Sequence, residues 1–117
     1  MDYSEEKLWD QINDGWSRMS RDQKLFWDAV KILPTQWELR GHGPYWVVGL
    51  IGQNAVYFNH QEGGFNRSAW RALSILEHYQ SMQWGLHEAI ANELDIMRSG
   101  YNSGPKTTGP LPGEFKR

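Results

Sequence analysis

Polar side chains of the types that carry chemistry gather directly after the apolar stretch 45–59. The cluster consists of Asn59, His60, Glu62, Asn66, Arg67 and Ser68. The apolar stretch predicts a rigid hairpin, and loops that leave a rigid scaffold are common places for binding and catalytic residues. This cluster is therefore the first candidate for a functional site.

The residue types of the cluster could serve a metal site or a hydrolytic triad, but their spacing fits neither. His60 and Glu62 would share one face of an extended strand, yet two ligands at this spacing fall short of a zinc motif. His42 or His87 would complete three ligands only if the fold brought them near. Ser68 adds the third residue type of a hydrolytic triad, but there is no Gly-x-Ser-x-Gly turn and all three lie in one short loop. We predict no catalytic residue, no metal and no cofactor.

Two interpretations of the cluster stay open. Asparagine and glycine suit left-handed turn positions, and Glu62 and Ser68 can accept hydrogen bonds from the backbone of a wide loop. The same side chains can instead form the polar rim of an interaction surface, in which tryptophan and arginine are the usual anchors. In the second interpretation the predicted binding residues are His42, Asn59, His60, Glu62, Asn66, Arg67 and Trp84.

Seven tryptophans are spread along the 117 residues. We expect most of them in the core, and Trp27, which lies off the apolar stripe of its helix, is a candidate exposed ring. These features favour a non-enzymatic protein-interaction module of the adaptor or toxin-inhibitor (immunity) type, whose partner is another protein. Two alternatives remain. One is a small hydrolase or a metal- or small-ligand-binding protein that uses His60 and Glu62, and the other is carbohydrate binding by exposed tryptophans.

A β-hairpin is predicted to position the cluster. Residues 45–51 and 54–59 are apolar runs that are too short for helices and rich in β-branched and aromatic side chains. A two-residue type II′ loop at Gly52-Gln53 would set the register. The expected cross-strand partners are Ile51 with Asn54, Val48 with Tyr57, and Val47 with Phe58. Both faces of this ribbon are apolar, so the rest of the chain must cover both.

Two helices and a strand are predicted before the hairpin. The first helix begins at a Ser4 cap and the second at a Ser20 capping box. Their apolar stripes are Leu8, Trp9, Ile12, Trp16 and Met19 in the first, and Leu25, Phe26, Ala29, Val30 and Leu33, up to Pro34, in the second. Residues 35–40 alternate between polar and apolar, which is typical of a half-exposed strand.

The pattern of residues after the cluster permits two structures. A helix over residues 69–80 could start at Ser68, but an extended path from Phe65 to Trp70 competes with it. Residues 86–97, followed by Arg98 and Gly100, predict a final helix. The expected fold is α+β, an antiparallel meander of three to four strands with two N-terminal helices and C-terminal helices packed on it. It forms one domain, residues 1–100, and residues 101–117 are expected to be a flexible Gly/Pro-rich tail.

Composition bears on the partner and the location. The net charge is −2, and five carboxylates and one lysine fall within residues 1–14, which makes nucleic acid an improbable partner. The chain has no cysteine, so it has no disulfide framework or thiolate metal site, and an intracellular location is the simpler interpretation. No apolar run approaches the ~18 residues of a membrane span. We expect a cytoplasmic protein without a membrane partner, and the sequence does not predict its oligomeric state.

The hairpin and its exit resemble the core of a group of small bacterial proteins. The resemblance rests on Trp46-Val47-Val48, Tyr57-Phe58-Asn59, Glu62-x-Gly64-Phe65-Asn66-x-Ser68 and Gln83, and covers residues 35–95. It implies a bacterial origin and one compact domain, and it implies no particular activity.

Overall fold

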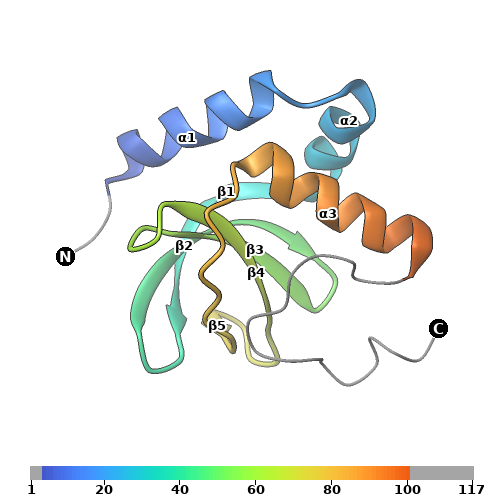
Figure 1. Ribbon diagram of the computed structural model, residues 1–117. Coiled ribbons are helices and arrows are strands. Elements are labelled where there is room, and N and C mark those ends of the chain that lie inside the picture. The colour runs from blue at the N-terminus through green and yellow to red at the C-terminus, as the bar shows by residue number, and fades with distance from the viewer. Residues whose placement is uncertain (1–3, 101–117) are drawn as a thin grey trace.

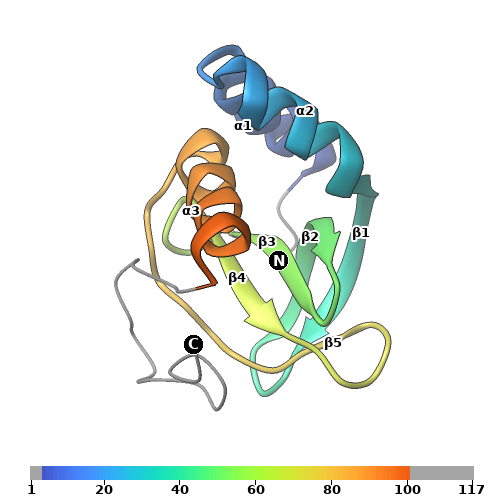
Figure 2. The ribbon, with the colours of Figure 1, turned by 90° about the vertical axis from the view of Figure 1, so that its right-hand side faces the viewer.

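The computed structural model describes residues 4–100. Its elements are α1 (Glu5–Ser17), α2 (Arg21–Val30), β1 (Lys31–Leu39), β2 (Gly43–Ile51), β3 (Asn54–Asn59), β4 (Gly64–Ala69), β5 (Ile75–Leu76) and α3 (Leu86–Ser99). The three helices lie on one side of a curled sheet (Figures 1 and 2). This arrangement confirms the predicted α+β class. The predicted tail, residues 101–117, lies outside the described residues.

Both N-terminal helices begin at the predicted caps. Ser4 Oγ accepts a hydrogen bond from the Lys7 N–H at 3.2 Å, and Ser20 forms a reciprocal capping box with Gln23. The prediction that the second helix continues to Pro34 was wrong. The helix ends at Val30, and β1 starts with the next residue because Lys31 already pairs with β2.

The buried face of α2 also differs from the predicted stripe. Trp27 is only 4% exposed, whereas Leu25 and Leu33 are 56% and 81% exposed. The Trp27 ring packs over the backbone of Gly49, where an added Cβ would lie 3.3 Å from Trp27 Cζ3. The expectation of an exposed Trp27 was therefore wrong, because the glycine leaves room for the ring against the sheet.

Strands β1 to β4 form the predicted antiparallel meander, and β5 adds two residues parallel to β1. Gly52 turns the hairpin with a positive φ of 59°, and Ile51 pairs with Asn54 as predicted. The other two expected pairs were wrong by one residue. Tyr57 pairs with Val47, and Phe58 pairs with Trp46. The cause is a register shift between Val47 and Gly49, since a bulge adds one residue to one strand only.

The hairpin is covered on both faces, as its double apolar pattern predicted. The helix-side core includes Leu8, Ile12, Met19, Phe26, Trp27, Val48, Val56, Phe58, Phe65, Leu86 and Ile90. The core on the other face contains Trp37, Leu39, Tyr45, Val47, Ala55, Tyr57 and Leu76. The sheet therefore separates two cores, and β2 and β3 contribute to both.

Residues 77–85, which we call the strap, connect β5 to α3 along the free edge of β4 (Figure 1). The Glu77 N–H donates to the Ala69 carbonyl at 3.1 Å, and the Phe65 N–H donates to the Trp84 carbonyl at 2.8 Å. The helix considered for residues 69–80 does not form, and the extended path from Phe65 to Ala69 is β4. A helix there would have left the β4 edge without partners.

Candidate functional site

The asparagines of the predicted cluster are buried and bind the strap. Asn66 Nδ2 donates to the carbonyls of Met82 at 3.1 Å and Gly64 at 3.2 Å, and its Oδ1 accepts from the Met82 N–H at 2.8 Å. Asn59 Nδ2 donates to the Gln80 carbonyl at 2.8 Å, and its Oδ1 accepts from two N–H groups of the following turn. These side chains supply hydrogen bonds that a regular neighbouring strand would otherwise give to this part of the sheet.

Ser68 has the same structural use. Its Oγ accepts hydrogen bonds from the N–H groups of Glu77 at 2.9 Å and His78 at 2.8 Å, and donates to the Ala69 carbonyl at 2.8 Å. A serine nucleophile needs a neighbouring general base on its hydroxyl, and these three partners are all backbone groups. The geometry therefore gives Ser68 a role in holding the strap.

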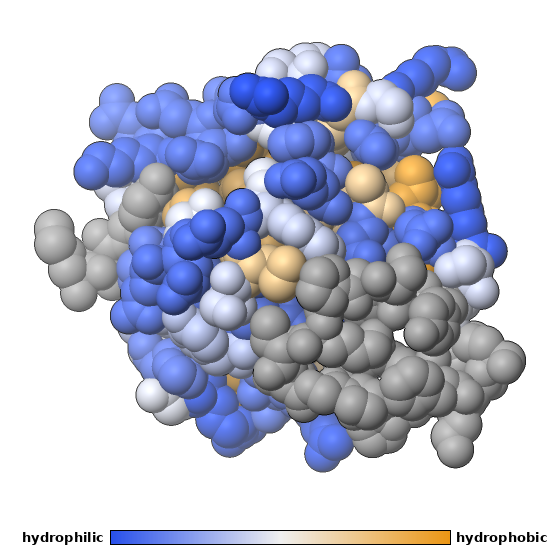
Figure 3. Space-filling model, in the orientation of Figure 1, coloured by the Kyte–Doolittle hydropathy of each residue, from blue (hydrophilic) through white to orange (hydrophobic). Residues whose placement is uncertain are grey.

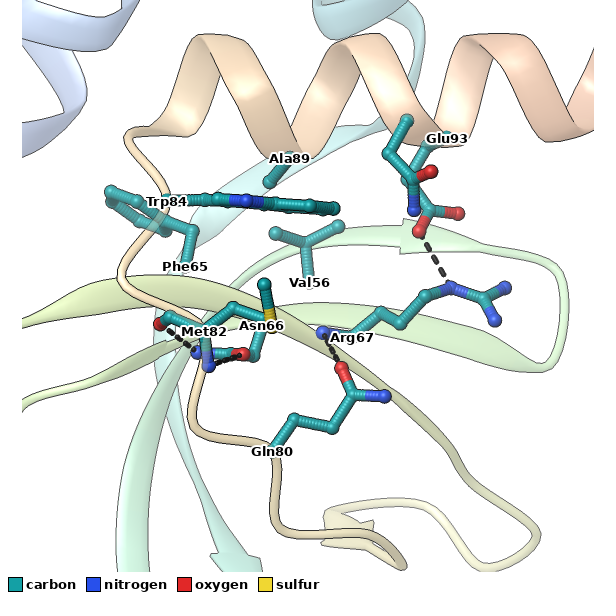
Figure 4. Close-up of a pocket in the computed structure, with 10 residues that line it drawn as sticks. Val56, Phe65, Asn66, Arg67, Gln80, Met82, Trp84, Ala89 and Glu93 are labelled. Atoms are coloured by element: carbon teal, nitrogen blue, oxygen red, sulfur yellow. Dashed lines mark hydrogen bonds and ion pairs between the residues drawn. The ribbon is translucent and has the colours of Figure 1, made fainter. Parts of the chain in front are cut away.

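Arg67 forms a buried ion pair with Glu93 of α3 (Figure 4). Arg67 Nε lies 2.6 Å from Glu93 Oε2, and the two side chains are 13% and 4% exposed. Burial raises the pKa of Glu93 above its ordinary value, and the attraction and hydrogen bond of Arg67 oppose that shift. The pair ties α3 to β4, and Glu93 was not among the predicted site residues.

The cavity beside this pair is small. Its volume is about 20 Å³, and its lining is Val56, Phe65, Asn66, Arg67, Gln80, Met82, Trp84, Ala89, Asn92 and Glu93. Figure 4 shows the Trp84 ring lying flat between Ala89 of α3 and Val56 of the sheet, where it forms one wall. A cavity of this size suits one or two water molecules, whereas ligand pockets measure about 300–1,000 Å³. Trp84 therefore serves mainly to pack α3 on the sheet.

Two predicted residues lie at the rim of the second core. The His42 ring stacks on Tyr79 and the His60 ring on Tyr45, each with ring centroids 4.6 Å apart. Gln61 Oε1 accepts hydrogen bonds from both tyrosine hydroxyls, at 3.1 Å and 3.3 Å. The fold therefore brings His42 and His60 onto two neighbouring tyrosines, where their imidazoles cover aromatic rings.

Glu62 is half-buried in the turn between β3 and β4, where its N–H donates to Asn59 Oδ1 at 3.2 Å. Within residues 4–100, no three His, Cys, Asp or Glu side chains are grouped so that they could hold a metal ion. The predicted cluster thus divides into buried residues that bind the strap and a partly exposed rim of His42, His60 and Glu62.

A larger groove opens between α1 and the junction of α2 with β1. Its volume is about 560 Å³, and its lining is Trp9, Ile12, Asn13, Trp16, Trp27, Asp28, Lys31, Ile32 and Leu33. Trp27 is buried, whereas Trp9 and Trp16 are 38% and 44% exposed. We call this the tryptophan groove. Its size and its mixture of aromatic walls with a few polar groups match those of binding sites.

Both exposed rings are held by polar neighbours. Trp9 Nε1 donates to Glu5 Oε2 at 3.2 Å, and Lys24 Nζ lies 4.0 Å from the centroid of the Trp16 ring. Side chains that are already restrained lose less conformational entropy when a partner binds. Binding to the two restrained rings would therefore cost less conformational entropy than binding to freely rotating ones.

Trp9 and Trp16 were predicted to belong to the buried stripe of the first helix. The structure buries only one side of that stripe, with Leu8 and Ile12 against the core. Trp9 and Trp16 are seven residues apart, so they project from the same face of α1, next to the buried side. The five positions of the stripe span about 100° of the helix, which is an ordinary width for one buried face, so their spacing alone did not indicate that Trp9 and Trp16 are exposed.

Other exposed apolar residues are scattered. Leu25 lies on α2, Leu73 precedes β5, and Met97 lies near the end of α3. On the face that Figure 3 shows, most residues are hydrophilic and the hydrophobic residues occupy small, separate areas. In the described part of the chain, the groove is the place where several large exposed apolar side chains lie together, namely Trp9, Trp16 and Leu33, and the others lie apart.

No family model matches the chain, and no curated protein or solved structure shows significant similarity to it. None of the helices within residues 4–100 has the length and apolar character required to cross a bilayer.

Proposed function

We propose that the protein is a non-enzymatic protein-interaction module of the adaptor or toxin-inhibitor kind, and that the tryptophan groove is its main binding surface. The observation that carries the proposal is the pair of restrained, half-exposed rings of Trp9 and Trp16 in a groove of about 560 Å³. Aromatic anchors at a pocket supply much of the energy of protein–protein binding. The cysteine-free composition favours a cytoplasmic partner.

The partly exposed rim of His42, His60 and Glu62 is a second, smaller part of this proposal. The buried Asn59 fixes the turn that carries His60 and Glu62, because its Oδ1 accepts hydrogen bonds from the backbone of that turn. Buried groups that restrain exposed neighbours would favour binding by the same entropic argument as in the groove.

Partner capture from cells of the source organism, followed by reconstitution with the purified partner, tests the proposal. We expect the W9A/W16A double variant to lose at least about 2 kcal/mol of binding free energy, since aromatic hot spots cost this much or more when truncated. The measurement is titration calorimetry with wild type and variant.

The matched control is L73A/M97A, which removes two exposed apolar side chains away from the groove. We expect it to bind like the wild type, and thermal melts of both variants show whether they remain folded. Undiminished binding by folded W9A/W16A would remove the groove from the proposal. Alanine at His60 and Glu62 then tests the rim.

Carbohydrate binding is a second candidate, favoured by the presence of Asn13 and Asp28 beside the exposed rings of Trp9 and Trp16. Sugars present apolar faces to aromatic rings and hydroxyl groups to amides and carboxylates. Titration with a panel of oligosaccharides, followed by tryptophan fluorescence, distinguishes this candidate from a protein partner.

A further inference from the structure

The charges along the tryptophan groove differ between its two ends. Glu5 and Glu6 lie beside Trp9 on α1, because positions three and four residues apart are neighbours on the surface of a helix. Within the described part of the chain neither glutamate has a salt-bridge partner, and Glu5 instead accepts the hydrogen bond of the Trp9 indole N–H. The end of the groove at Trp9 is therefore acidic.

The other end is different. Lys24 lies over the Trp16 ring, and the nearby acid Asp14 is paired with Arg18 at 3.2 Å. On the opposite wall, Asp28 and Lys31 pair at 2.9 Å. A partner that fits both ends must bring cationic groups to Trp9 and has no such need at Trp16.

The backbone beside the groove favours a helical partner over an added strand. The outer edge of β1 pairs with β5 only at Glu38 and Leu39, so the part next to the groove is open. Pro34 in that part has no N–H to donate, and the Leu33 carbonyl already accepts a hydrogen bond from Thr35 Oγ1 at 2.8 Å. An extended peptide would therefore find an incomplete ladder.

The dimensions fit a short amphipathic helix. Trp9 and Trp16 are seven residues apart, which corresponds to about 10 Å along α1 and about two turns of a partner helix. Apolar residues spaced by three or four positions on such a helix would meet both rings.

We propose that the tryptophan groove binds an amphipathic α-helix of a partner protein, with its apolar face on Trp9 and Trp16 and with lysine or arginine at the end beside Trp9. This inference rests on the proposed function and adds the chemistry of the partner segment. It predicts a preference that depends on the charge flanking the apolar face.

Two synthetic helical peptides test this preference. They share one apolar face, and one carries lysine and the other glutamate at all flanking positions. We expect the lysine peptide to bind at least about tenfold more tightly at low salt, and the difference to shrink as added salt screens the charges. Binding is measured by tryptophan fluorescence and confirmed by calorimetry.

Charge reversal in the protein provides the matched test. E6K should weaken or remove the preference for lysine. E38K makes the same kind of change on an exposed position of β1 and should leave the preference as in the wild type. W9A/W16A should weaken binding of the lysine peptide at least tenfold.

Several results would overturn the inference while leaving the proposed function standing. The first is equal affinity of the two peptides, and the second is no binding of either peptide at about 1 mM. The third is a native partner that enters the groove as a strand. The fourth is occupation of the groove by a second copy of this chain, which sedimentation would detect. A native partner that W9A/W16A binds as tightly as the wild type does would instead contradict the proposed function itself.

Discussion

Asn66 replaces part of a missing neighbouring strand with a single side chain. It forms three hydrogen bonds to backbone groups of Gly64 and Met82 and is 2% exposed. An asparagine in a polar loop fits a binding site and a backbone clamp equally well by residue type. The difference depends on burial, which the strap creates.

We predict that N66A destabilises the protein by about 2–4 kcal/mol, because it leaves the buried Gly64 carbonyl and the partly buried backbone groups of Met82 without these partners. Urea denaturation at neutral pH measures the loss. N13A makes the same change on an exposed position of α1 and should remain within about 0.5 kcal/mol of the wild type. A loss for N66A no larger than that for N13A would show that the clamp does not hold the strap.

Elements whose ends are marked by local signals were predicted correctly. Segments whose conformation depends on contacts with distant parts of the chain were not. Ser4, Ser20 and Gly100 mark helix ends through their own caps, so α1, the start of α2, and α3 could be predicted. The pattern of residues 69–80 also permitted a helix, but that segment is held extended by side chains of Asn59 and Ser68.

In the candidate site, too, residue types could be predicted from the sequence and long-range contacts could not. The sequence identified the polar cluster but not its burial, because the partners of Asn59 and Asn66 lie in the strap, far along the chain. The sequence placed Trp9 and Trp16 on the apolar stripe of the first helix, but it did not predict their exposure, which depends on how α1 packs. Gly15 allows close packing of α1 on α3, since an added Cβ would lie 2.6 Å from Leu86 Cβ.

The ion pair between Arg67 and Glu93 joins β4 to α3 and should make stability depend on pH. The pKa of Glu93 is raised in the folded state above its ordinary value of 4.5. The stabilisation that comes from protonated Glu93 is therefore fully present below pH 4.5, and it is lost as the pH rises through the raised pKa. R67M removes the attraction that opposes this shift, so it should raise the pKa further and cost about 3–5 kcal/mol at neutral pH.

Unfolding free energies measured between about pH 4 and pH 8 check this prediction. The deficit of R67M relative to the wild type should shrink toward acidic pH, because Glu93 becomes neutral. R67M/E93Q carries neither charge and should recover part of the loss without the same pH dependence. A deficit for R67M that stays constant with pH would contradict an ionised Glu93 as its cause.

For the whole molecule, the two cores share one hairpin. Val48 and Val56 belong to the helix-side core, while Val47 and Tyr57, their neighbours in sequence, belong to the other. Loss of either core exposes one face of the same two strands. The two cores are therefore expected to unfold together.

L8A and L76A test this coupling, because each removes a fully buried side chain from a different core. Each should cost about 2–5 kcal/mol, whereas L73A, at a leucine that is 71% exposed, should have little effect. Far-UV circular dichroism and tryptophan fluorescence should give coincident transitions for all three variants. If L76A gave an early fluorescence transition with helices intact, the second core would be a separate unit, and β2 and β3 would remain stable with only the helix side covered.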